Sequence, residues 1–123
     1  MQPSPPIRFV VTIQVHDVDR FRAIVARCVD VSRAEPGTLH YDWFLDEATG
    51  AARLVEAYAS VDAVLAHARG PVFTDVGPEL LETCTFVSMD AFGDTGPLGE
   101  AAQFWPTTYW GTPFAELGGV TAD

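Results

Sequence analysis

Lysine is absent from the sequence, and seven arginines stand against 17 acidic residues, which gives a formal net charge of −10. Binding to nucleic acid phosphates requires clustered cations, so this charge balance excludes nucleic acid as a partner. It also argues against contact with an anionic membrane surface. A strongly anionic substrate is disfavoured as well, unless several arginines converge on it.

Cysteine is scarce, and long apolar runs are missing. Cys28 and Cys84 lie far apart in the sequence, which is typical of buried, reduced thiols rather than of a disulfide framework. The first residues, MQPSPPIRF, lack the basic and apolar regions of a secretory signal. No apolar run approaches the roughly 18 residues needed to span a bilayer. We therefore expect a cytoplasmic protein that makes no membrane contact.

Motifs for nucleotides, metals and covalent catalysis are missing too. The sequence has no G-x-G-x-x-G or G-x-x-x-x-G-K-[ST] loop and no G-x-S-x-G nucleophile turn. His16, His40 and His67 lie far apart, without the spacing of a metal site. We predict that the protein uses no metal and no organic cofactor. Any chemistry would then come from side chains and from the substrate itself.

Alternating strands and helices are present in a chain of 123 residues, which is long enough for one domain. Apolar residues alternate with others along residues 7–15, which predicts a strand. Three further segments are rich in aromatic or branched residues and predict strands at 38–45, 51–59 and 83–92, the first two of which form a hairpin.

Helices are predicted between these strands. Asp17 is a suitable N-cap for an amphipathic helix that Pro36 and Gly37 end, and Ser60 is a suitable N-cap for a second helix. Gly70 followed by proline interrupts the second helical region, which continues to about residue 81. The order β-α-β-β-α-β predicts a ferredoxin-like α+β fold, in which an antiparallel sheet carries both helices on one face.

The predicted strands carry apolar side chains on both of their faces. By alternation, Phe9 lies on the opposite face from Val10 in the first strand. In the second strand, Phe44 lies on the opposite face from Leu39, Tyr41 and Trp43. In the last strand, Phe86 lies on the opposite face from Met89. Two helices cover only one face, so the other face requires a second sheet, and an identical subunit is its simplest source. The alternative is a solvated face with scattered apolar residues.

The two ends of the chain depart from this pattern. Residues 1–6 contain three prolines and are predicted to form a loose arm. Residues 94–123 show no strand or helix period but contain five aromatic residues, which would not be stable in water as a free tail. We expect this tail to pack on the partner subunit or over the mouth of a pocket.

Four segments follow one another in a recognisable order: EPGTLHYDWFLDE (35–47), VEAYAS (55–60), AVLAH (63–67) and PVF (71–73). Over about residues 7–92 the chain resembles the antibiotic-biosynthesis monooxygenase superfamily, which has a Pro-Gly before the second strand, a Glu-x-aromatic on the third and a histidine on the second helix. The resemblance implies a domain at residues 7–93 that forms a dimeric α+β barrel, with a cavity between sheet and helices. The tail is similar to that of quinol-monooxygenase-like members, where it adds to the dimer.

Members of this superfamily include cofactor-independent oxygenases that convert anthrone- or quinol-type aromatics to quinones, the deprotonated substrate giving an electron to dioxygen. The resemblance therefore implies a cofactor-free monooxygenase or tailoring enzyme whose partners are a small aromatic or polyketide-like molecule and dioxygen. Other relatives degrade haem, isomerise or cyclise, so the fold alone does not fix the reaction. A cyclase or isomerase acting by proton transfer stays open, and so does a non-catalytic dimeric protein that binds a small molecule.

The third strand holds two candidate catalytic residues. In the family's oxygenases this strand presents an Asn and, four residues on, a Trp to the cavity, and the matching positions here are Leu54 and Tyr58. Glu56 lies between them on the same face, and a carboxylate in a half-apolar cavity has a raised pKa and can act as a base. The alternative is that Glu56 pairs with an arginine such as Arg53 or Arg69, or caps the dimer interface.

Tyr58 and His67 complete the catalytic candidates. The Tyr58 hydroxyl is suited to orient a substrate oxygen, and the alternative is a packed strand aromatic. His67 borders the apolar face of the second helix, where it is a candidate proton shuttle or hydrogen-bond donor. The alternative is a helix residue bonded to a nearby carboxylate.

A further set of residues is predicted to bind substrate: His40, Tyr41, Trp43, Leu54, Phe73 and Trp105. Direct pairing across the hairpin puts Tyr41 beside Glu56 and Trp43 beside Leu54. A bulge in the turn would shift the register by one and bring His40 into the cavity instead. An aromatic-walled cavity suits a flat substrate, although aromatic residues are also ordinary core.

Overall fold

The structure is a computed structural model that describes residues 6–96, 98, 106–117 and 119–120. The arm predicted for residues 1–6, apart from Pro6, lies outside the described residues, and so does Trp105. Within the described part of the chain, no helix is long and apolar enough to cross a membrane. Cys28 and Cys84 are free and buried, as predicted, and burial raises the pKa of the Cys28 thiol to about 11.

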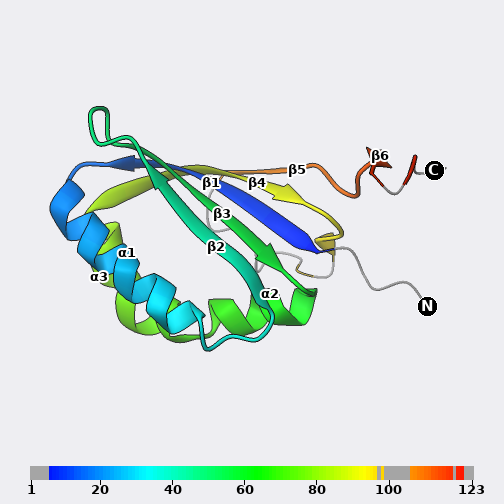
Figure 1. The fold of residues 1–123 in the computed structure, drawn as a ribbon, viewed down its shortest axis with the longest axis horizontal. Helices are drawn as coiled ribbons and strands as arrows, with labels where there is room; N and C mark the ends of the chain where they lie inside the picture. The colour runs from blue at the N-terminus through cyan, green and yellow to red at the C-terminus, as the bar shows by residue number, and fades with distance from the viewer. Residues whose placement is uncertain (1–5, 97, 99–105, 118, 121–123) are drawn as a thin grey trace.

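The chain folds as an antiparallel sheet with helices on one face, in the predicted element order (Figure 1). The elements are β1 (Ile7–Val15), α1 (Val18–Ser32), β2 (Thr38–Leu45), β3 (Ala51–Tyr58), α2 (Val61–Ala68), η1 (Val72–Val76), α3 (Gly77–Leu81), β4 (Cys84–Phe92), β5 (Thr107–Tyr109), β6 (Ala115–Glu116) and β7 (Gly119–Val120). The strand order β2-β3-β1-β4 is that of a ferredoxin-like sheet, so the predicted fold class is confirmed. β5 extends this sheet beside β4.

Both predicted N-caps are confirmed. The Asp17 carboxylate accepts a hydrogen bond from the Arg20 backbone N–H at 3.3 Å, at the start of α1. The Ser60 hydroxyl accepts one from the Ala63 backbone N–H at 3.1 Å, at the start of α2. These side chains satisfy amide groups that the first turn of a helix leaves without partners.

The helical region predicted after Gly70 is present but is not one regular helix. η1 is a π-helical turn, in which the Gly77 N–H bonds to the Val72 carbonyl five residues earlier. Pro78 follows and has no N–H to donate, so a regular α-helical ladder cannot pass through this point. The region therefore consists of a wide turn and the separate helix α3.

Two β-bulges alter the strand faces that simple alternation predicts. In β4, Thr12 pairs with Ser88 and Ile13 pairs with Phe86, so Val87 is an extra residue. Phe86 and Met89, expected on opposite faces, therefore both face the helices and line the same cavity.

The second bulge lies in β2. Thr38 pairs with Tyr58 and His40 pairs with Ala57, so Leu39 is the extra residue. The expectation that Leu39 shares a face with Tyr41 is therefore wrong, because the register shift reverses the alternation.

The main core lies between the sheet and the helices. The inward side chains of β1 are each at most 4% exposed: Ile7, Phe9, Val11, Ile13 and Val15. Phe21, Ile24 and Cys28 of α1 belong to the same buried cluster. Burying one large apolar side chain stabilises the fold by about 1.5–3 kcal/mol, so this cluster fixes α1 on the sheet.

Part of the C-terminal tail forms a strand that the sequence pattern does not predict. β5 pairs in parallel with β4, Met89 opposite Thr107 and Ala91 opposite Tyr109. Trp110 then stacks on Phe92, with ring centroids 6.4 Å apart, and its indole N–H donates to the Asp90 carboxylate at 3.0 Å. This part of the tail therefore packs on the chain's own sheet and does not cover the cavity.

Candidate functional site

A cavity of about 460 Å³ lies between the inner face of the sheet and the layer formed by α2, η1 and α3. Most of its lining is apolar. The polar side chains gather on one wall, which β2, β3 and α2 form: Tyr41, Trp43, Glu56, Tyr58 and His67. Phe73 and Leu81 line the cavity and are 38% and 51% exposed, so they mark its entrance.

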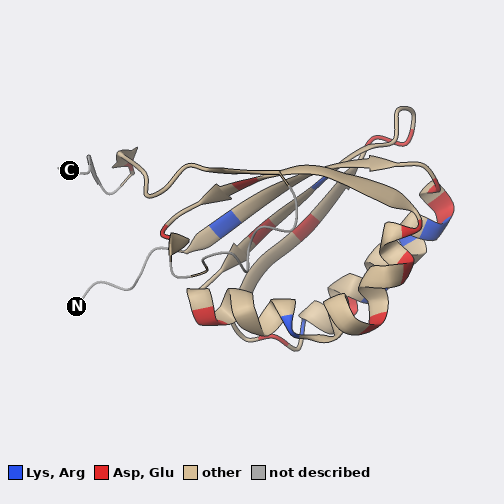
Figure 2. Ribbon diagram, turned by 180° about the vertical axis from the view of Figure 1, so that it is seen from behind, with Lys and Arg blue, Asp and Glu red and all other residues tan. Residues whose placement is uncertain are grey.

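No arginine is found among the described residues that line this cavity. Acidic residues are spread over the helices and the sheet, whereas basic residues are few (Figure 2). Four arginines form ion pairs with exposed acids, such as Arg20 with Glu82 and Arg27 with Glu79. A neutral ligand therefore fits this site better than an anionic one.

The sequence allows two registers for the hairpin of β2 and β3, and the structure has the direct one. Tyr41 lies opposite Glu56 and Trp43 lies opposite Leu54. The bulge in β2 lies at its beginning, away from the turn, so it does not shift these pairs. Tyr41, Trp43, Leu54 and Glu56 consequently line one cavity.

Glu56 is buried on this wall, with 8% of its surface exposed. Its carboxylate accepts a hydrogen bond from the Tyr58 hydroxyl at 2.6 Å, and His67 Nε2 lies 3.9 Å from the same oxygen. Burial raises the pKa of Glu56, while the Tyr58 hydrogen bond and the His67 charge oppose that rise. Among the described residues no arginine is found paired with Glu56, and Arg53 donates to the Ala52 carbonyl instead.

Tyr58 is 1% exposed and donates its hydroxyl proton to Glu56. Burial, followed by the charge of Glu56, raises the pKa of Tyr58 far above the ordinary value for a phenol. The hydroxyl therefore keeps its proton and remains a donor. The pair of Glu56 and Tyr58 places a proton acceptor and a proton donor side by side in a largely apolar cavity.

His67 is held from its other side by a second carboxylate. Its Nδ1 atom lies 2.7 Å from Glu35 Oε1. Three aromatic rings surround the imidazole, those of Tyr41, Tyr58 and Phe73, with centroid distances of 5.2, 5.4 and 5.5 Å. The alternative considered for His67, a helix residue bonded to a carboxylate, is thus observed, and the same ring also lines the cavity.

Tyr41 and Trp43 form the aromatic end of the wall. Their rings meet edge to face at 5.6 Å, and Trp43 also contacts Phe21 of α1 at 5.7 Å. Burial raises the pKa of Tyr41, so its hydroxyl stays neutral. The Trp43 indole N–H is buried and has no hydrogen-bond partner within the described residues.

One of the residues predicted to bind substrate, His40, is not brought to the cavity. His40 lies on the opposite face of β2, with its side chain 66% exposed and Asp42 Oδ2 3.8 Å from its Nδ1. The prediction that His40 lines the pocket is wrong for this chain, because the bulge that would have turned it inward does not occur. Trp105 lies outside the described residues.

Sequence reasoning missed Glu35, which contacts the site through His67. Its signal is weak, because the residue lies in a loop and no periodicity places it near α2. It also missed the contribution of Phe9 and Val11 of β1 to the cavity floor. Within the described residues, no cluster of three or more His, Cys, Asp or Glu side chains has metal-binding geometry.

The sequence profile of the antibiotic biosynthesis monooxygenase family matches residues 6–77, which is more than half of the chain. The chain therefore belongs to this family. This confirms the resemblance drawn from the sequence segments between residues 35 and 73. A comparison with curated protein sequences found no match.

Several solved structures share the fold at low sequence identity. MupZ from Pseudomonas fluorescens is 16% identical with a TM-score of 0.72, over 95% of this chain and 99% of that one. SnoaB, a cofactor-independent oxygenase from Streptomyces nogalater, is 18% identical with a TM-score of 0.60, over 67% of this chain and 86% of that one. Rv0793 from Mycobacterium tuberculosis is 24% identical with a TM-score of 0.56, over 66% of this chain and 85% of that one. The match to MupZ necessarily includes residues after 93.

Proposed function

We propose that this protein is a cofactor-independent oxygenase that oxidises a small, neutral aromatic or polyketide-like molecule of the anthrone or quinol type. The observation that carries the proposal is the buried pair of Glu56 and Tyr58 on the polar wall of the 460 Å³ apolar cavity. Family membership supports an oxygenase, and the lack of cavity-lining arginines favours a neutral substrate. The other partner is dioxygen.

In this proposal Glu56 removes a proton from the bound substrate. The apolar cavity makes an ionised carboxylate a stronger base than it is in water, as the raised pKa of Glu56 reflects. The Tyr58 hydroxyl then donates its hydrogen bond to the oxygen on which the substrate's negative charge develops. Tyr41, Trp43 and Phe73 hold a flat ring system against this wall.

The substrate anion supplies the electrons for the oxidation. It transfers one electron to dioxygen, and the resulting radical pair combines to form a carbon–oxygen bond. For an anthrone-type substrate, loss of water from the peroxide converts the CH₂ group into a carbonyl, so that one oxygen atom enters the product and the other leaves as water. No external reductant is needed, because the two C–H bonds of the substrate provide the electrons.

A proton-transfer cyclase or isomerase is the second candidate. The specific observation in its favour is that Glu56 and Tyr58 are hydrogen-bonded as a base and an acid, which is sufficient for such chemistry without oxygen. Leu54 also occupies the position where the family's oxygenases carry an amide. The two candidates share the ionisation step and differ in whether oxygen is consumed.

Oxygen uptake with a panel of anthrones and hydroquinones tests this proposal. We expect uptake matched by quinone formation, and we expect it to persist after exhaustive chelation and removal of flavin, because no described group has metal-binding geometry. Product formation under anaerobic conditions would contradict an oxygenase and favour the cyclase or isomerase. Saturable binding without any turnover would indicate a non-catalytic binding protein. Restoration of lost activity by one metal would contradict cofactor independence.

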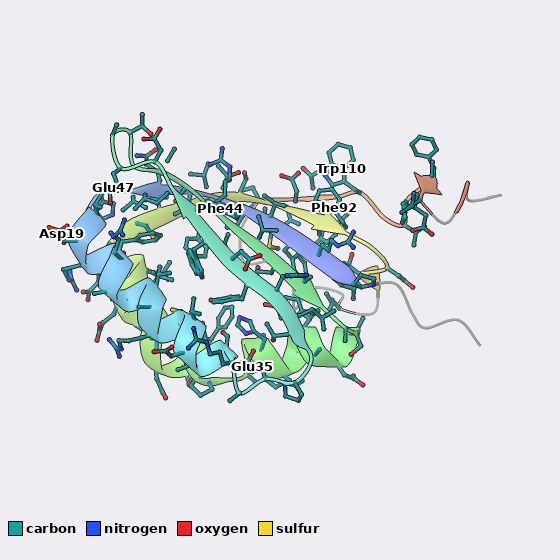
Figure 3. The ribbon with its side chains drawn as sticks, in the orientation of Figure 1. Asp19, Glu35, Phe44, Glu47, Phe92 and Trp110 are labelled. Carbon is teal, nitrogen blue, oxygen red and sulfur yellow. The ribbon has the colours of Figure 1, made fainter. Side chains whose placement is uncertain are left out.

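We also propose that two copies of the chain pair through the outer face of the sheet, to give a dimeric α+β barrel. Phe44, Phe92 and Trp110 are 57%, 37% and 62% exposed. Figure 3 shows them along the sheet on the side away from the helices. An apolar face of this kind is typical of an interface between subunits.

Light scattering at micromolar concentration is expected to give twice the chain mass. Phe44→Glu should shift the protein toward the monomer, since it places a charge on the apolar face, whereas Glu47→Gln on the neighbouring turn should leave the mass unchanged. A stable wild-type monomer at this concentration would contradict the pairing.

A further inference from the structure

Glu35 is a half-buried acidic residue that does not line the cavity but contacts a residue that does. It lies in the loop between α1 and β2, and Figure 3 labels it beneath the sheet, near the end of α1. Its side chain is 17% exposed, and that of its partner His67 is 5% exposed. The Nδ1–Oε1 distance between them is 2.7 Å, which is the length of a charge-assisted hydrogen bond.

The orientation of the His67 ring follows from this contact. A carboxylate can only accept, so Nδ1 carries the proton that it donates to Glu35. Nε2 then points to the other side, where Glu56 Oε1 lies 3.9 Å away. Glu35 Oε1 also accepts from the Thr38 hydroxyl at 2.8 Å, which fixes the carboxylate independently of His67.

The titratable groups that face His67 are carboxyl and phenol groups. Glu35 faces it from the loop before β2, Glu56 and Tyr58 face it from β3, and Tyr41 faces it from β2. Phe73 of η1 contributes an uncharged ring. The ion pairs of the described arginines involve other acids, so His67 is the only basic side chain found to pair with Glu35 or Glu56 in the described part of the chain.

We propose that Glu35 is a positioning residue, which holds His67 with Nε2 directed at Glu56 and thereby supports Glu56 in its ionised, proton-accepting form. This inference rests on the proposed role of Glu56 as the base. Glu35 acts only through His67 and contacts no substrate, because it lies behind the histidine as seen from the cavity. A histidine oriented by a carboxylate on one nitrogen and acting through the other is a recurring arrangement in catalytic and metal sites.

Substitution of Glu35 should therefore lower kcat and leave KM nearly unchanged. We expect Glu35→Gln, which keeps an acceptor but removes the charge, to lower kcat by about 10-fold. Glu35→Met, which removes both, should lower it by about 10²-fold. In a His67→Gln background either substitution should have no further effect. Glu82→Gln is the matched control, because it removes one negative charge from an exposed ion pair.

The pH at which Glu56 ionises distinguishes the proposed role of Glu35 from a purely structural one, because a structural role would leave that pH unchanged. Without Glu35, His67 is no longer held against Glu56, so the acidic limb of the kcat/KM profile should move to higher pH. The loss of the Glu35 charge itself acts on the pKa of Glu56 in the opposite direction, but it is the smaller of the two effects. The same limb should stay in place in Glu82→Gln. Equal activity losses with an unshifted limb, or additive losses in the double variant, would overturn the proposal.

Nitrogen-15 NMR of the imidazole rings tests the geometry without any substrate. The chain has three histidines, and His16 and His40 are exposed and act as internal references. In the wild type, His67 Nδ1 should give the signal of a protonated nitrogen, because the Glu35 carboxylate accepts its proton. In Glu35→Met the Nδ1 signal should move to that of an unprotonated nitrogen at high pH.

Failure of the two hypotheses would look different. An unprotonated Nδ1 in the wild type would overturn the role of Glu35, whatever the reaction. The predicted NMR behaviour together with no oxygen uptake from any substrate would leave the contact of Glu35 with His67 intact but contradict the oxygenase. If Glu35→Met does not fold, the kinetic comparison of Glu35→Gln with Glu82→Gln still decides the proposal.

Discussion

Glu56→Gln is expected to lower turnover by about 10²–10⁴-fold, which is the usual contribution of a positioned general base. Glutamine has the shape of glutamate and can still accept the hydrogen bond of Tyr58, but it cannot take up a proton from the substrate. Substrate affinity should change little, because the apolar walls of the cavity are untouched. Single-turnover oxygen consumption, normalised to folded protein, measures the effect.

The same substitution has a predictable effect on stability. Since the pKa of Glu56 is raised in the folded state, the native protein keeps a proton in a pH range where the unfolded chain has lost it. The stabilisation is complete below the ordinary carboxyl pKa of about 4.3 and is lost as pH rises through the higher folded value. Glu56→Gln has no such proton to lose. Its free energy of unfolding should therefore increase relative to that of the wild type, so that the variant becomes relatively more stable, as pH rises from about 4 toward neutrality.

Glu47→Gln is the control for both measurements, because Glu47 is an exposed residue that pairs with Arg22 on the far side of α1. It should change neither the rate nor the slope of stability against pH. A lower melting temperature for Glu56→Gln at every pH, with near-normal activity per folded molecule, would mean that Glu56 is only a structural partner of Tyr58 and His67.

Tyr58→Phe is expected to lower kcat by about 10²-fold or more. Its hydroxyl is the one donor within hydrogen-bond distance of Glu56 among the described residues, and in the proposed reaction it turns to the developing substrate oxyanion. Removing it also deprives Glu56 of a hydrogen bond that favours its charged form, so the pKa of Glu56 should rise further. The acidic limb of the rate profile should then move to higher pH.

Tyr109→Phe provides the matched comparison for this prediction, since Tyr109 is an exposed tyrosine on β5, outside the cavity lining. It should behave as the wild type. Near-normal turnover in both Tyr58→Phe and Glu56→Gln would show that β3 is not the catalytic wall, and attention would then move to Trp43 and His67.

Much of this fold could be predicted because local signals and tertiary structure agree. Alternation predicted the bounds of β1, and aromatic and branched residues predicted those of β2. The side chains of Asp17 and Ser60 marked the beginnings of α1 and α2. The pairing of Tyr41 with Glu56 followed from the short hairpin, in which the simplest register is the observed one.

What could not be predicted depends on contacts between distant segments. The bulges at Leu39 and Val87 reverse strand faces without any change in composition, so the inward positions of Thr38 and Met89 were not visible. β5 was missed because a three-residue edge strand has too few positions to show alternation. Glu35 lies 32 positions before His67, and only the packing of the loop against α2 brings them together.

We propose that Glu56 ionises a bound aromatic substrate in the cavity. Mixing the protein with an anthrone under anaerobic conditions is a direct test, because the substrate can then ionise but cannot be oxidised. The anthrone anion differs from the neutral molecule in its visible absorption, so ionisation can be followed without oxygen. We expect the anion to form on the wild-type protein, to fail to form on Glu56→Gln despite binding, and to disappear with quinone formation once oxygen is admitted. Binding of the anthrone in its neutral form to the wild type, or equal anion formation on both proteins, would contradict it.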